Sequence, residues 1–96
     1  MFKSIKASEL DNLFNPKIID IRSNEHYNNN HIKNSINIPS KDLLNNPGKY
    51  LDRNQVYYIY CQRGIQSRKV CQILINNNFN VVNISGGYEA WLLNQQ

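Results

Sequence analysis

The sequence predicts a single α/β domain built on a small, mainly parallel sheet with helices on both faces. Short runs rich in β-branched or aromatic residues alternate along the chain with amphipathic stretches. Three of these four runs are apolar almost throughout, as is typical of parallel strands covered on both sides. Alternation of this kind favours right-handed crossovers between the strands. Because 96 residues suffice for one hydrophobic core, we expect one domain over residues 1–96.

Each element is predicted from its own local signals. Asn tolerates left-handed backbone, so the Asn triplets at 28–30 and 76–78 indicate helix ends or turns. Proline and glycine mark a loop-rich middle. The predicted strands are 17–21, 35–38, 56–60 and 81–84; the predicted helices are 8–14 with Ser8 as N-cap, 67–77, 87–93 and a short one around 41–44.

Composition narrows the class of partner. The formal charge is +4, but Lys and Arg are spread along the chain without the basic stripe of a nucleic-acid binder. No stretch approaches the length of a membrane span, and the first ten residues lack the apolar core of a signal peptide. The two cysteines therefore predict reduced thiols. We expect a cytoplasmic monomer that binds neither nucleic acid nor membrane.

The stretch YIYCQRGIQSRK, residues 58–69, predicts an anion-binding loop. Cys61 ends a central strand and a helix is expected to begin near Ser67, and ligands of open α/β sheets bind at that end of the strands. If the loop curls around the sulfur, its backbone N–H groups converge there and the first turn of the helix supports them. Gly64 permits so tight a curl.

Such a position favours Cys61 as a nucleophile, because converging N–H donors stabilise the thiolate. A lone cysteine in a strand-rich core is more often a small buried hydrophobe. The following glycine and the cations Arg63, Arg68 and Lys69 favour the functional interpretation here. Cys71 is the contrast, since it lies mid-helix between apolar neighbours and is predicted to be structural.

Several chemistries use such a thiol. The absence of a CxxC pair argues against a metal, and a dyad with His31 is not needed where the loop itself activates the sulfur. Phosphate-ester hydrolysis and sulfur transfer remain. A tyrosine-phosphatase loop carries Arg where this chain has Ser67, and it needs a general acid for the leaving alkoxide. Sulfur transfer needs none, because sulfite already leaves readily, so a phosphatase or arsenate reductase is the weaker alternative.

Three ordered segments resemble the rhodanese-like, or thiosulfate sulfurtransferase, domain family: IDIRSNEHYNNNHIKNSINIP (19–39), YCQRGIQS (60–67) and LINNNFNVVNISGGYEAW (74–91). The resemblance implies Cys61 as a persulfide-forming nucleophile with the loop backbone as its cradle, and no cofactor or metal. The implied substrate-binding residues are Gln62, Arg63, Gly64, Ile65, Gln66, Ser67 and Arg68, with Asp20 and Arg22 in support.

The departures from the family pattern carry expectations of their own. Asn30 and Asn78 replace glycines, so both are expected to adopt positive φ. Gln66 stands where active members often carry Arg, which leaves Arg63 and Arg68 to attract a dianionic donor.

Other marked residues are expected to be scaffold. Arg22 and Glu25 have the spacing of an ion pair that would brace a turn, while Asp20 would orient Arg22 or cap a backbone turn. His31 is expected to be a hydrogen-bonded turn residue. Trp91 is expected to belong to the core, with a lid over the site as the alternative. Gly86 and Gly87 predict a tight strand-to-helix turn.

Two functions follow. The first is a sulfurtransferase that passes sulfur from thiosulfate or a similar small anionic donor, through Cys61, to cyanide, a thiol or a protein acceptor. The second is a non-catalytic rhodanese-like module that docks a partner. The intact Cys61 and Gly64 favour the first.

Overall fold

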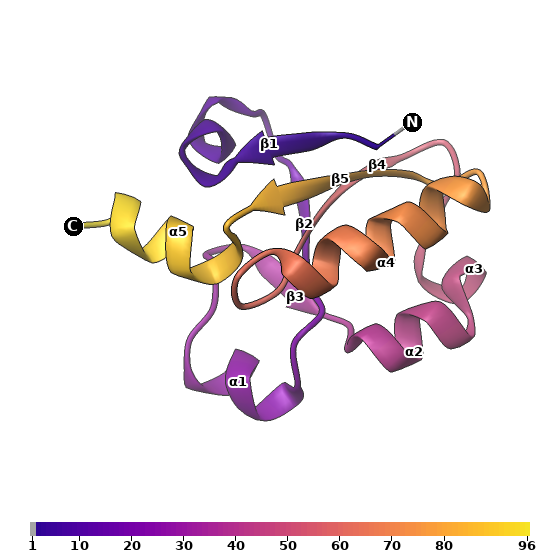
Figure 1. The fold of residues 1–96 in the computed structure, drawn as a ribbon, viewed down its shortest axis with the longest axis horizontal. Coiled ribbons are helices and arrows are strands. Elements are labelled where there is room, and N and C mark those ends of the chain that lie inside the picture. The colour runs from indigo at the N-terminus through magenta and orange to yellow at the C-terminus, as the bar shows by residue number, and fades with distance from the viewer. Residues whose placement is uncertain (1) are drawn as a thin grey trace.

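A five-stranded sheet in the order β1-β5-β4-β2-β3 forms the centre of the computed structural model, which describes residues 2–96 (Figure 1). Every neighbouring pair of strands is parallel. All carboxyl ends therefore meet at one edge, where ligands of such sheets bind. The strands are β1 (Ser4–Lys6), β2 (Lys17–Asp20), β3 (Ser35–Asn37), β4 (Val56–Tyr60) and β5 (Asn80–Ser85).

Helices cover both faces of the sheet, as predicted (Figure 1). On one face, α2 and α4 pack against Ile19, Ile59 and Val81. On the other, the 3₁₀ helix η1 and the C-terminal α5 pack against Ile18, Tyr60 and Ile84, because successive strand residues point to opposite sides. The helices are η1 (Ala7–Asn12), α1 (Asn24–Asn29), α2 (Ser40–Asn45), α3 (Pro47–Tyr50), α4 (Ile65–Asn76) and α5 (Gly87–Asn94).

The four predicted strands and the helices at 41–44, 67–77 and 87–93 are confirmed to within a few residues. No helix within residues 2–96 is both long enough and apolar enough to cross a bilayer. The prediction for 8–14 was wrong in type and start. A 3₁₀ helix begins at Ala7, and the Glu9 carboxylate accepts the Lys6 N–H at 3.3 Å, so Ser8 lies inside the helix and does not cap it.

Three elements were not predicted. The strand β1 is three residues long with only Ile5 partly buried, and α1 buries no residue, so neither shows the apolar period from which elements are recognised. Instead, α1 begins with the Ser23 hydroxyl accepting the His26 N–H at 3.3 Å. The short α3 carries Pro47 in its first turn.

Asparagine serves the left-handed turns of this chain, although not at both expected positions. Asn78 has φ of +69°, as predicted. Asn30 was wrongly assigned, since its φ is −170° and the backbone there is extended. The Asn30 carbonyl accepts a hydrogen bond from Arg22 at 2.7 Å, which the extended conformation allows. Besides glycines, the other residues with positive φ within residues 2–96 are Asn15 and Asn34, with φ of +46° and +71°.

Tyr60 ties the sheet to the loop before β3. Its fully buried hydroxyl accepts the Ile32 N–H at 3.0 Å and lies 3.0 Å from the Ser35 hydroxyl. Burial raises the pKa of Tyr60 well above its ordinary value, so the phenol stays neutral and can serve both partners.

Tyr60→Phe is expected to lower the free energy of unfolding by about 1–3 kcal/mol, because the buried Ile32 N–H loses its acceptor. Urea unfolding measures the loss. Tyr58→Phe, in the same strand but only half-buried, is the matched control and should cost less. Equal losses in the two variants would contradict this role of the Tyr60 hydroxyl.

Candidate active site

Cys61 directly follows β4 at the carboxyl edge of the sheet, where the strand order places it between β2 and β5. The side chain is 5% exposed. The helix that follows begins at Ile65, two residues earlier than predicted, and Gly64 precedes it with φ of +89°. A four-residue turn, 61–64, therefore carries the chain from the strand into α4.

The cradle, the backbone from Gln62 to Ser67, directs N–H groups at the sulfur. The Gly64 N–H donates to Cys61 Sγ at 3.2 Å and the Ser67 N–H at 3.3 Å. Ser67 Oγ lies 3.4 Å from the same sulfur. These donors belong to the start of α4, whose helix dipole adds positive potential there. Converging N–H donors at a helix start are the arrangement of a small anion site.

The outer side of the same turn is bound by the first turn of α5. The Tyr88 N–H donates to the Cys61 carbonyl at 2.9 Å, and the Glu89 N–H donates to the Gln62 carbonyl at 3.0 Å. These two carbonyls are thus bound by α5, while the Gly64 and Ser67 N–H groups of the cradle donate to the sulfur. The first N–H groups of α5, which have no partner within their own helix, thus hold the loop that precedes α4.

Glycines allow the two turns to approach so closely. A Cβ on Gly64 would lie 2.8 Å from the Gly86 nitrogen, and a Cβ on Gly87 would overlap the Cys61 carbonyl oxygen. Gly86 and Gly87 also have φ of +75° and +59°, which confirms the predicted tight turn.

Arg22 links the end of β2 to the cradle. Its guanidinium pairs with Asp20 at 2.7 Å, donates to Gln62 Oε1 at 2.9 Å and lies 4.5 Å from the centre of the Tyr88 ring. Burial acts to lower the pKa of Arg22, but the hydrogen bonds and charge of Asp20 outweigh it and raise the pKa. The predicted pairing with Glu25 was wrong, because Asp20 is in direct reach and also accepts the Arg22 N–H at 2.8 Å.

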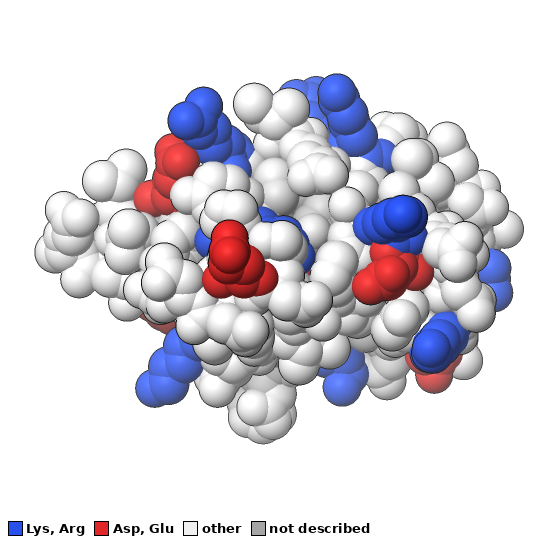
Figure 2. All heavy atoms as spheres, turned by 90° about the horizontal axis from the view of Figure 1, so that it is seen from below, with Lys and Arg blue, Asp and Glu red and all other residues white. Residues whose placement is uncertain are grey.

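The loop cations are less concentrated on the sulfur than their sequence spacing implies. Arg63 is 73% exposed and pairs with Glu89 at 3.3 Å. Arg68 lies over the Phe2 ring and lines, with Lys69, a cavity of about 550 Å³ beside Gly64. In the face shown in Figure 2, Lys and Arg are interspersed with Asp and Glu.

Two residues of the predicted loop sit at its exposed rim. Gln66 is exposed and its amide donates to the Ser40 hydroxyl at 3.1 Å. Ile65 is 65% exposed at the first turn of α4.

Sequence reasoning missed Asn83, which is 3% exposed and bonded to Ser67. The available signal was a polar residue within the otherwise apolar run VVNI, since a buried polar group in a central strand needs a partner. Glu89 was missed as well, and nothing in its local sequence points to Arg63.

Cys71 behaves as predicted, fully buried among apolar side chains. Burial, and secondarily the nearby Cys61, raises the pKa of Cys71 to about 12. Both thiols are free. His31 is bonded through its ring nitrogen to the Tyr27 carbonyl at 2.8 Å, as expected of a turn residue.

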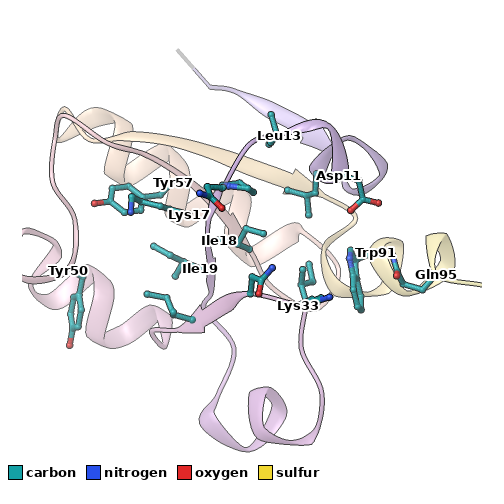
Figure 3. A pocket seen from close by; sticks show the side chains of 16 residues that line it. Asp11, Leu13, Lys17, Ile18, Ile19, Lys33, Tyr50, Tyr57, Trp91 and Gln95 are labelled. Carbon is teal, nitrogen blue, oxygen red and sulfur yellow. The ribbon is translucent and has the colours of Figure 1, made fainter.

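A larger cavity lies at the opposite edge of the sheet (Figure 3). It measures about 910 Å³ and extends from Tyr50 and Tyr57 past Lys17 to Trp91. Trp91 is half-buried there, against the core formed with η1, and so does not cover Cys61. Within residues 2–96, no group of three His, Cys, Asp or Glu side chains is placed to hold a metal.

The fold and the site together define a small parallel α/β protein with a backbone cradle around a cysteine. Comparison with known proteins identifies the family: residues 6–94 match the Rhodanese-like domain, and the chain belongs to this family. It is 34% identical to the rhodanese-like domain protein of Staphylococcus aureus, whose structure superposes with a TM-score of 0.85 over 94% of this chain and 91% of that one.

Two curated relatives carry functional names. The thiosulfate sulfurtransferase GlpE of Shewanella oneidensis is 30% identical over 94 residues, covering 94% of this chain and 92% of that protein. The tRNA sulfurtransferase of Thermoplasma acidophilum is 35% identical over 91 residues, covering 79% of this chain but only 18% of that protein. The chain thus corresponds to nearly all of one relative and to a small part of the other.

Gly87→Ala is expected to displace the cysteine turn, because the added methyl group would overlap the Cys61 carbonyl. The left-handed backbone alone should cost about 1–3 kcal/mol in urea unfolding, and native Cys61 should alkylate more slowly. Gly48→Ala, where no atom lies within 4 Å of the new Cβ, is the control and should change neither quantity adversely. Unchanged stability and reactivity in Gly87→Ala would show that the turns do not depend on this contact.

Proposed function

We propose that the protein is a sulfurtransferase that carries sulfane sulfur as a persulfide on Cys61. The Cys61 thiolate attacks the outer sulfur of thiosulfate or a similar anionic donor. A new S–S bond forms, the S–S bond of the donor breaks, and its electron pair leaves with sulfite. A thiophilic acceptor, such as cyanide, a thiol or a protein thiol, then attacks the terminal sulfur and returns the Cys61 thiolate.

The observation that supports this proposal most directly is the convergence of the Gly64 and Ser67 N–H groups on Cys61 Sγ. N–H donors so placed stabilise the attacking thiolate, and the loop that carries them would then hold the persulfide. The position that a tyrosine phosphatase fills with Arg is filled by fully buried Ser67. The relatives named thiosulfate sulfurtransferase add support from similarity.

The remaining residues would have positioning roles. Arg22 fixes Gln62 and, with α5, the shape of the cradle. Arg63 would attract the donor anion, although the negative charge of its partner Glu89 offsets part of that attraction. A catalytic cycle through a free thiol requires a reducing compartment, so we propose that the protein acts in the cytoplasm. We also propose that it acts as a monomer and without a cofactor.

Incubation with thiosulfate followed by intact mass measurement tests the proposal. One added sulfur atom is expected, removable by a reducing agent, retained in Cys71→Ser and absent in Cys61→Ser. One sulfite should be released for each sulfur atom added to the protein. An unmodified protein with thiosulfate and with other sulfane donors would refute the enzyme and favour the non-catalytic docking module.

The charge of the donor gives a finer test of Arg63. Arg63→Ala should raise the apparent KM for thiosulfate about two- to fivefold, the range of an exposed ion pair, and should affect a monoanionic donor less. Glu89→Gln should lower the KM for thiosulfate, because it releases Arg63 from its carboxylate partner. Steady-state kinetics measures both. An equal change in KM for the two donors would show that Arg63 does not distinguish them by charge.

A further inference from the structure

A buried hydrogen-bonded chain runs from Cys61 through Ser67 to Asn83. The Cys61 Sγ and Ser67 Oγ atoms are 3.4 Å apart, and Ser67 Oγ donates to Asn83 Oδ1 at 2.6 Å. Ser67 is fully buried and Asn83 is 3% exposed. These hydrogen bonds join the start of α4 to the middle of β5. Asn83 has no role in the sulfur chemistry described above.

The thiol and the Ser67 hydroxyl carry one proton each, and these protons fix which atom donates in each of the two hydrogen bonds. With a neutral thiol, S–H donates to Ser67 Oγ, and the single hydroxyl proton of Ser67 is donated to Asn83. When the sulfur becomes an anion its proton goes to solvent, and no other covalent bond changes. The anion can only accept, so the Ser67 hydroxyl stabilises it only by turning toward the sulfur.

That turn would leave Asn83 without its donor unless the carboxamide also reverses. A carboxamide carries an acceptor and a donor at nearly the same positions, so rotation of its end group presents an N–H to Ser67 Oγ. Asn83 also lines the cavity of about 550 Å³ with Arg68 and Lys69, so the carboxamide borders space into which its displaced carbonyl oxygen can turn.

We propose that Asn83 is a positioning residue that, through a reversal of its carboxamide, lets the Ser67 hydroxyl donate to the anionic sulfur of Cys61. The proposal deepens the proposed sulfur-transfer function and rests on it for its catalytic meaning. Its structural content, a coupling between the Asn83 amide and the charge of Cys61, is measurable whether or not sulfur is transferred.

Charged or titratable groups lie on each element packed around Cys61, Ser67 and Asn83. The strand β1, which pairs with β5 at Asn83, carries Lys6 and follows Lys3, whose carbonyl accepts the Asn83 N–H at 2.9 Å. From α4 come Cys71, whose high pKa keeps it neutral, and the cavity-lining Arg68 and Lys69. The cradle contributes Arg63 with its α5 partner Glu89, and the end of β2 contributes Arg22 with Asp20. These groups are the same in every variant below, so differences between variants report the hydrogen-bonded chain.

The test is the pH dependence of Cys61 alkylation by iodoacetamide, followed by peptide mapping. Asn83→Asp keeps the shape but can, as a carboxylate, only accept, so it holds the Ser67 hydroxyl away from the sulfur. The pH of half-maximal alkylation should rise by about one to two units, equivalent to losing one hydrogen bond to a charged group. Asn80→Asp, the same change at the exposed start of β5, is the matched control and should shift it far less.

A double-mutant comparison separates the hydrogen bond from the field of the new carboxylate. In a Ser67→Ala background the field remains but the hydroxyl is gone, so the shift caused by Asn83→Asp should fall to less than half. An equal shift in both backgrounds would overturn the proposal, as would no shift in Asn83→Asp.

A measurement on the unmodified chain covers the case in which Asn83→Asp does not fold. The side-chain amide resonances of Asn83 in ¹H–¹⁵N spectra should move with pH at the same midpoint as Cys61 alkylation, and should not do so in Ser67→Ala. Asn83 amide resonances that do not move at the pH midpoint of Cys61 alkylation would overturn the proposal. A coupled amide in a protein that forms no persulfide would instead refute only the proposed sulfur transfer.

Discussion

Two strand-to-helix turns, one carrying Cys61 and the other carrying Gly86 and Gly87, bind each other through backbone hydrogen bonds, and the site depends on that contact. The N–H groups that begin α5 take the carbonyls of Cys61 and Gln62. The Gly64 and Ser67 N–H groups of the same loop donate to Cys61 Sγ. Glycine is required because any Cβ would separate the turns.

Arg22 extends the same organisation to a third strand. A buried guanidinium must satisfy several N–H donors at once, and here Asp20, the Asn30 carbonyl and Gln62 accept them. Removal of any one acceptor would leave a buried charge incompletely paired. The residue thus serves less as a substrate ligand than as the connection between the end of β2, the segment after α1 and the cradle.

The distribution of charge around the sulfur separates the loop backbone from the loop side chains. The backbone supplies the donors closest to Cys61, while Arg63 is exposed and shared with Glu89, and the Gln66 amide is bound to Ser40. Backbone dipoles act at short range, whereas exposed charges are screened by solvent and salt. The positive potential at the sulfur therefore comes from the backbone more than from the loop cations.

Local patterns in the sequence predict four of the five strands, the place of Cys61 at a strand end and the glycine turn, because apolar period and glycine spacing are local properties. The same residues carry the family resemblance. The pairing of Arg22 with Asp20, the reach of Arg22 to Gln62 forty residues away and the bond of Ser67 to Asn83 sixteen residues away are seen only in the folded structure. These contacts join different elements, so they follow from the strand order and from the burial of each polar group, which no local pattern encodes.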